Sequence, residues 1–154
     1  MPVYLLLFLF SVSAMAQPAK PVTGPCGLLT KAEVQEAVGS PVSDGVPEKL
    51  NKLVCSFQLG ETGSVVSVLL TGKAVNENAA KTVAELKKQK MNAEVVTGFG
   101  ESAYASTPMS GMQQLGAYKG VNQVIVTVLI MGAPEAKLKS VVEGLMRKAL
   151  ARLP

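Results

Sequence analysis

Alternating and continuous runs of apolar residues divide the chain into six predicted strands. In segment 54–59, Cys55, Phe57 and Leu59 recur at every second position, as in a strand with one buried face. The run QVIVTVLIM at 123–131 is apolar on both faces, which is typical of a strand in the middle of a sheet. The strands are predicted over 54–59, 64–71, 94–97, 103–106, 112–119 and 123–131. Their hairpin-length connections predict an antiparallel sheet.

Three segments show the periodicity of amphipathic helices. The first begins after Thr30, because Thr30-Lys-Ala-Glu33 matches a capping box, in which each of the two side chains accepts a hydrogen bond from the other residue's backbone amide. Gly39 ends this helix. The second helix is predicted over about 76–91, and the third begins at Pro134 and carries an apolar stripe to the end of the chain.

This order of elements predicts an α+β fold: an antiparallel five- to six-stranded sheet with helices packed mainly on one face. If all three helices cover that face, the other face carries Val65 and Leu69 and offers a half-apolar surface to a ligand, a partner or another subunit. Met109 and Met112 lie at the loop 107–111 and either add an adaptable contact surface or pack beneath the loop. These four residues form the predicted contact surface.

The chain opens with a short apolar run that ends in Ala14-Met-Ala16, the pattern of small residues that signal peptidase recognises. We therefore predict an exported protein, located in the periplasm or outside the cell. The proline-rich segment that follows has no apolar period and is interpreted as an extended tether. The predicted organisation is a signal peptide over 1–16, a tether over 17–25 and a single α+β domain over 26–154.

The two cysteines of the chain, Cys26 and Cys55, are predicted to form a structural disulfide. They lack the CxxC spacing of a redox couple, and an exported protein folds in an oxidising compartment. If the chain is not exported, both cysteines are expected to be buried free thiols.

Several short motifs resemble a known group of bacterial proteins. The motifs are Pro25-Cys26-x-Leu28-Leu29-Thr30-x-x-Glu33-Val34, Gly39-x-Pro41-Val42, a second cysteine that opens a strand, and Gly98-x-Gly100-Glu101-x-Ala103-Tyr104. With them the chain is similar to the uncharacterised bacterial secreted and lipoprotein domain family of unknown function whose mature part opens with Cys-x-Leu-Leu-Thr. The resemblance implies helices packed on an antiparallel sheet, a Cys26–Cys55 bridge and no established activity. Many such domains are lipid-anchored, but here no cysteine stands at the predicted cleavage point.

Composition removes several classes of function. The chain has no histidine, which excludes a His-based triad and the usual zinc site. Asp44 is its only aspartate, and the glutamates show no loop-type clustering, which argues against calcium. The segment 98–103 matches G-x-G-x-x-A, but strand-like residues follow it, so we interpret it as a turn and not as a dinucleotide site. We predict no catalytic residue, no metal ligand and no cofactor.

The charge pattern limits the choice of partners. A net charge of +4 is ordinary for a soluble domain and also favours weak contact with anionic surfaces. The most basic segment is 76–91, where no aromatic residue interleaves with the lysines at 81, 87, 88 and 90. Nucleic acid is therefore not a predicted partner, since stacking aromatics are missing and an exported chain rarely meets it.

Export, the predicted disulfide and the missing catalytic motifs favour a non-catalytic binding or sensing module of the bacterial cell envelope. Its partner is an unknown protein or small ligand, and its oligomeric state is not predicted. One alternative is a His-free, hydrolase-like enzyme with a serine or threonine nucleophile activated by lysine. Another is an adhesion module that contacts anionic envelope surfaces through the lysines of 76–91.

Overall fold

The computed structural model describes residues 24–60 and 63–154. The predicted signal peptide, 1–16, and residues 17–23 of the predicted tether lie outside the described residues. The described chain opens with a 3₁₀-helix, η1 (Pro25–Gly27), in which Pro25 is buried. Within the described residues, no helix is both long and apolar enough to cross a membrane.

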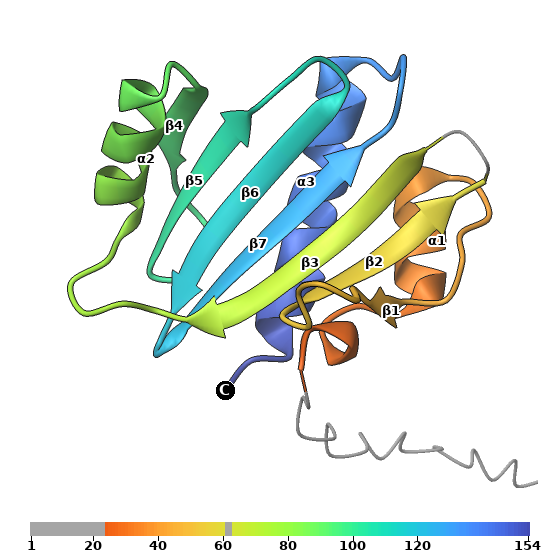
Figure 1. The fold of residues 1–154 in the computed structure, drawn as a ribbon, viewed down its shortest axis with the longest axis horizontal. Coiled ribbons are helices and arrows are strands. Elements are labelled where there is room, and N and C mark those ends of the chain that lie inside the picture. The colour runs from red at the N-terminus through yellow and green to blue at the C-terminus, as the bar shows by residue number, and fades with distance from the viewer. Residues whose placement is uncertain (1–23, 61–62) are drawn as a thin grey trace, which may run out of the picture.

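The described residues form one seven-stranded sheet in the order β1-β2-β3-β7-β6-β5-β4, and every neighbouring pair is antiparallel (Figure 1). The strands are β1 (Val46–Pro47), β2 (Val54–Leu59), β3 (Ser64–Gly72), β4 (Asn92–Val96), β5 (Ser102–Thr107), β6 (Met112–Lys119) and β7 (Asn122–Leu129). The α+β class and the antiparallel sheet are confirmed. The predicted number of five to six strands is wrong, because two-residue β1 contains a proline and has no apolar period that could reveal it.

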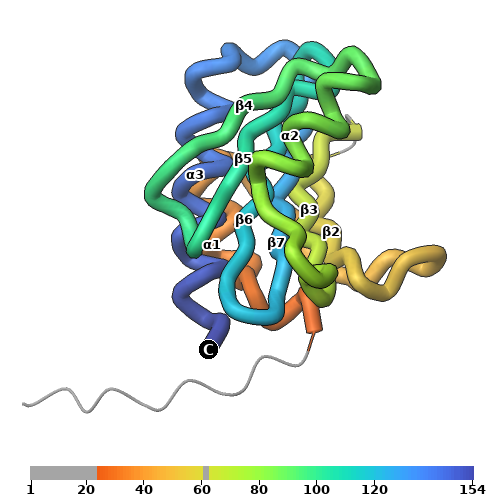
Figure 2. The backbone as a smooth tube through the Cα atoms, turned by 90° about the vertical axis from the view of Figure 1, so that its left-hand side faces the viewer, coloured from red at the N-terminus to blue at the C-terminus, as the bar shows by residue number. Residues whose placement is uncertain are grey.

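The helices lie on both faces of the sheet. Helices α1 (Lys31–Val38) and α3 (Glu135–Ala151) cover one face, here called the core face, whereas α2 (Ala79–Lys88) lies on the opposite face, the second face (Figures 1 and 2). Two of the three helices therefore share a face. The condition that all three cover the same face is not met, because two tyrosines on the second face give α2 an apolar surface of its own.

The main core lies between the core face and helices α1 and α3. Alternate residues of β3 and β7 supply its centre, and α3 contributes an apolar stripe over them. Its fully buried members include Val66, Val68, Val124, Val126, Val128, Leu138, Leu145 and Met146. β7 occupies the middle of the sheet, as its continuous apolar run predicts.

A smaller apolar cluster joins α2 to the second face over β4, β5 and β6. Tyr104 and Tyr118 pack against Ala79 and Val83 of this helix. Gly116 makes room for the Tyr104 ring, since a Cβ added there would lie 2.3 Å from ring carbons. Burial, reinforced by nearby Tyr118 and a glutamate, raises the pKa of Tyr104 to about 12, so its hydroxyl stays protonated.

The rest of the second face has no helix on it. Its apolar side chains are all half-buried, and we call them the second-face floor: Val54, Val65, Leu69, Met112, Ile125 and Leu129. A polar row crosses the same surface, where the Gln114 amide donates to the Thr127 hydroxyl at 3.0 Å. The floor thus covers β2, β3, β7 and one end of β6.

The N-terminal helix α1 is fixed at its start by two polar contacts. Thr30 and Glu33 form the predicted capping box, with the Thr30 amide 2.8 Å from Glu33 Oε2 and the Glu33 amide 3.3 Å from Thr30 Oγ1. Arg152, just after α3, donates to Glu33 Oε1 and to the Leu28 carbonyl, both at 2.8 Å. The two ends of the described chain are therefore held together by one guanidinium group.

The Cys26–Cys55 disulfide is confirmed, with Cα atoms 5.1 Å apart. It joins η1 to β2, and Cys55 is fully buried against the main core. The bond fixes the segment that precedes α1 to the sheet, across a sequence separation of 29 residues.

Replacement of both cysteines by serine is expected to lower the free energy of unfolding by about 3 kcal/mol, because the unfolded chain regains the entropy of the open loop. Urea denaturation followed by circular dichroism measures this change. The wild-type protein denatured in a reductant should unfold at the same urea concentration as the double variant. Equal stability of oxidised wild type and double variant would contradict the prediction.

Glu33→Gln is expected to destabilise the protein by about 1 kcal/mol at pH 7 and by progressively less as the pH falls below 4.5. Burial raises the pKa of Glu33, but hydrogen bonds from Arg152 and Thr30 outweigh it, so the net pKa is lowered from its ordinary value of 4.5. The stabilisation is therefore complete above pH 4.5 and is lost as the pH falls through the lowered pKa.

Thermal denaturation of both proteins between pH 3 and pH 7 measures this difference. Glu36→Gln is the matched control, because Glu36 lies on the same helix and makes only an exposed ion pair with Lys148 at 3.6 Å. A Glu33→Gln effect that does not change with pH would contradict the assigned role of the carboxylate.

Candidate functional site

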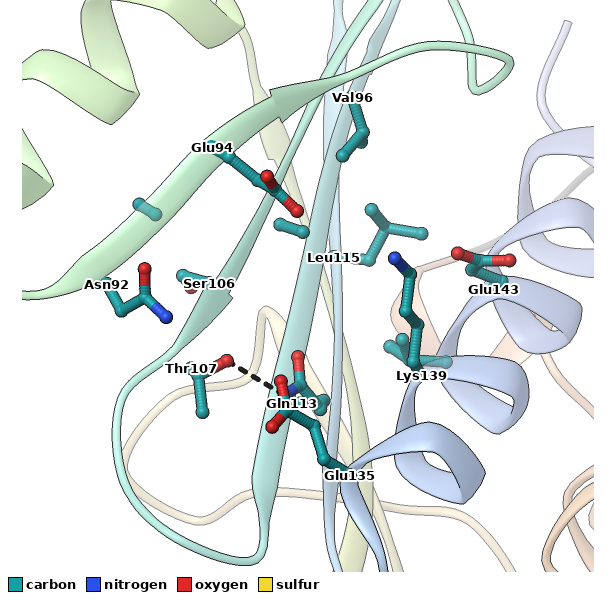
Figure 3. Close-up of a pocket in the computed structure, with 13 residues that line it drawn as sticks. Asn92, Glu94, Val96, Ser106, Thr107, Gln113, Leu115, Glu135, Lys139 and Glu143 are labelled. Carbon is teal, nitrogen blue, oxygen red and sulfur yellow. Dashed lines mark hydrogen bonds between the residues drawn. The ribbon is translucent and has the colours of Figure 1, made fainter.

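A cleft of about 140 Å³ opens on the core face between α3 and the end of the sheet formed by β4, β5 and β6. It exists because α3 crosses β6 and β7 and leaves the edge strand β4 uncovered, while α2 lies on the other face. We call it the α3–β4 cleft. Figure 3 shows its lining, which comes from the edge of the sheet on one side and from α3 on the other.

The base of the cleft is apolar. Ala105 of β5 and Leu115 of β6 face it from the sheet, and Val142 faces it from α3. The small Ala105 side chain fills little of the space between sheet and helix at this position. Leu115 and Val142 are buried, so the base continues directly into the main core.

A buried amide fixes the polar wall. Gln113 of β6 is only 6 % exposed, and its Nε2 donates to Thr107 Oγ1 at 2.8 Å and to Glu135 Oε1 at 3.4 Å (Figure 3). These bonds connect β6 to β5 and to the first turn of α3. The Glu135 carboxylate is thereby held at one end of the cleft.

Charged side chains surround the opening. Glu135, Lys139 and Glu143 follow one another at four-residue spacing on one side of α3, and Glu94 extends from β4 toward the same space (Figure 3). Three carboxylates against one amine leave a local formal charge of −2 in a chain whose net charge is +4. Among residues 24–60 and 63–154, the side chains of Glu94, Lys139 and Glu143 have no ion-pair or hydrogen-bond partner.

The carboxylates of the cleft are too far apart to chelate one metal ion. Glu135 and Glu143 are eight residues apart on a helix, which places them about 12 Å apart along its axis. In the described part of the chain, no three His, Cys, Asp or Glu side chains are close enough to hold a metal. The spacing suits an extended molecule with more than one positive group.

The residues predicted for contact lie elsewhere. Val65 and Met112 both pair with Leu129 in the sheet register, so the structure brings them into one row of the second-face floor. Leu69 lies on the same face, four residues along β3, beside Ile125. Met109 is 52 % exposed in the loop between β5 and β6 and belongs to neither surface.

The other predicted residues have structural roles. Cys26 and Cys55 form the disulfide, and Thr30 and Glu33 cap α1. Neither pair lines the α3–β4 cleft. Sequence reasoning did not identify the residues that line this cleft: Glu94, Gln113, Glu135, Lys139 and Glu143.

Comparison of the chain with protein-family models, with curated proteins and with solved structures finds no match. The function of the cleft is therefore argued from its own geometry and charge. Its chemistry is that of a small acidic depression with an apolar base and one buried, correctly bonded amide.

Proposed function

We propose that the protein is a non-catalytic binding module of the bacterial cell envelope, and that the α3–β4 cleft holds a small ligand with ammonium or guanidinium groups. The observation that carries this proposal is the arrangement of Glu94, Glu135 and Glu143 around a cleft with an apolar base. Ligand sites commonly combine an apolar lining with a few placed polar groups. Opposite charge on the ligand would then supply orientation and a faster encounter.

The lining also favours a particular shape of ligand. The apolar base lies between carboxylates that are spread along the cleft, so a linear molecule could place methylene groups over Leu115 and cationic groups at the two ends of the α3 row. Linear diamines and polyamines have this chemistry, as do lysine and arginine side chains of a peptide. A compact cation would meet only one carboxylate at a time.

Export is part of the proposal. A disulfide is consistent with folding in an oxidising compartment. The apolar start of the chain, with its Ala14-Met-Ala16 pattern, supports cleavage by signal peptidase. We further propose membership of the secreted and lipoprotein family that the Cys26-x-Leu-Leu-Thr30 motif resembles, on the strength of that motif.

The two alternatives have less support. A hydrolase without histidine needs a lysine amine beside a serine or threonine hydroxyl, and within the described residues no such hydrogen bond occurs. Adhesion to anionic surfaces would use Lys81, Lys87 and Lys90, which are exposed on or just after α2. These lysines lie on the second face of the sheet, so adhesion and ligand binding in the cleft do not compete.

The Glu94→Gln/Glu143→Gln double variant is expected to bind spermidine about tenfold more weakly than the wild type, since each exposed charge pair contributes up to about 1 kcal/mol. Neither carboxylate has a partner among the described residues, so the fold should be unaffected. Isothermal titration at physiological salt measures the affinity. Backbone amide NMR shifts should identify Gln113 and Leu115 as residues near the ligand.

The matched control is Glu36→Gln/Glu85→Gln, which removes two exposed carboxylates outside the cleft. It should bind spermidine within twofold of the wild type. An equal loss of spermidine affinity in both double variants would show that spermidine is attracted by overall charge and not by the cleft. Amide shifts confined to residues outside the cleft would show that the site is wrongly placed.

A further inference from the structure

We infer that the second face of the sheet binds a partner protein through an amphipathic helix with an apolar face and acidic flanks. The site is the second-face floor together with the two segments that border it, α2 and residues 47–53, and we call it the second-face groove. It lies on the opposite side of the sheet from the α3–β4 cleft. The inference does not depend on the ligand proposed for that cleft.

The groove has the composition of an interface core. Among the described residues on this face of β2, β3 and β7, none carries a charged side chain. They are apolar, hydroxyl or amide residues, and the apolar ones are only half-buried. A sheet face that remains in water is usually polar, whereas the second face mixes apolar and uncharged polar residues; the centre of a protein interface is likewise depleted of charge.

The central strand shows what is missing on this face. On the core face, Val124, Val126 and Val128 of β7 are fully buried beneath α3. On the second face the same strand presents Ile125 and Leu129, which are half-exposed because α2 covers only β4, β5 and β6. The strand has large apolar side chains on both faces, but a helix packs over only one of them.

The two raised borders of the groove leave room over the floor for a single helix. Figure 2 shows the segment 47–53 standing out from the sheet on the side away from α1 and α3, and α2 rises on the same side. A helix packed on a sheet adds a layer about 10 Å thick. A helix bound in the groove would therefore form one layer with α2, which packs on the same face. These borders would hold the flat second face of another copy away from the floor.

The border segment 47–53 adds apolar surface that faces no part of the described chain. Leu50 is fully exposed and Leu53 is 50 % exposed, and the adjoining Val46 is 57 % exposed. Exposed apolar side chains that gather in one short segment are typical of interaction sites in soluble proteins. The floor strands are six to nine residues long, so a helix of about 14 to 18 residues would span them.

Both borders carry net positive charge. Segment 47–53 has Lys49 and Lys52 against Glu48, and the Glu48 carboxylate already accepts a bond from Ser56 at 2.6 Å. Residues 77–90 have four lysines against Glu77 and Glu85, and the Glu77 carboxylate accepts a bond from the Tyr118 hydroxyl at 3.3 Å. The uncharged floor is complementary to the apolar stripe of a helix, and the basic borders are complementary to acidic residues on both sides of that stripe.

The test uses a fluorescent synthetic helix of about 18 residues with leucine and isoleucine on one face and glutamate on its flanks. Fluorescence anisotropy should show saturable binding to the full chain, and amide NMR shifts should map to β2, β3 and β7. A second peptide with the same apolar face and lysine flanks should bind at least fivefold more weakly. Leu69→Lys should weaken binding of the acidic peptide at least tenfold.

Val95→Lys is the matched control, because Val95 is a 53 % exposed apolar residue on edge strand β4, outside the groove. It should leave the affinity within twofold. If the Leu69→Lys variant does not fold, the amide NMR shifts that the acidic peptide causes in the wild-type protein still test the site. Equal binding of both peptides, or no binding of either, would overturn the inference. Two other results would also overturn the inference if the acidic peptide caused no amide shifts in β2, β3 and β7. One is concentration-dependent self-association that shifts these amides, and the other is binding of anionic phospholipid vesicles that shifts them.

Discussion

The apolar character of both faces of β7 is the constraint on which the rest of the structure depends. Strands that are apolar on both faces are typical of the middle of a sheet that is covered on both sides. α3 and α1 cover the core face, and Val124, Val126 and Val128 are fully buried there. α2 covers the second face only in part, because its contacts are the tyrosines of β5 and β6 rather than β7 itself. Both candidate binding surfaces follow from this uneven cover: a cleft where α3 leaves β4 open, and a groove where α2 leaves β7 open.

The local features of the fold could be predicted because each is encoded within a few residues. The capping box of Thr30 and Glu33 requires only their spacing, and the strand 54–59 follows directly from alternation. The disulfide required only two cysteines and the inferred compartment. The face on which α2 packs could not be predicted, because alternation assigns residues to a face without saying which helix covers it. Tyr104 and Tyr118 decide this, and Gly116 permits it by leaving space for a ring.

The α3–β4 cleft was harder to predict for the same reason. Glu135, Lys139 and Glu143 form a charged row that looks like any solvated helix face, and Glu94 lies in a short strand of mixed character. They face a common space only because α3 crosses β6 and β7 and stops short of the edge strand. The small side chain of Ala105 is no reliable local signal, since Ala103 and Ala117 on the same face are equally small and are fully buried. A charged row on one helix side, opposite an edge strand, is the pattern that sequence reasoning would need to recognise.

Strand β6 connects the cleft and the groove, so it decides whether binding at one could affect the other. Adjacent residues of β6 reach both: Gln113 bonds Thr107 and Glu135 in the cleft, while Gln114 bonds Thr127 on the second face. Coupling between the two sites would need an element with two alternative arrangements that both ligands distinguish. β6 is held between β5 and β7 by ladders along its length, and its side chains on both faces already have their hydrogen bonds. Because these bonds are complete in the structure, we expect the two proposed ligands to bind independently of each other.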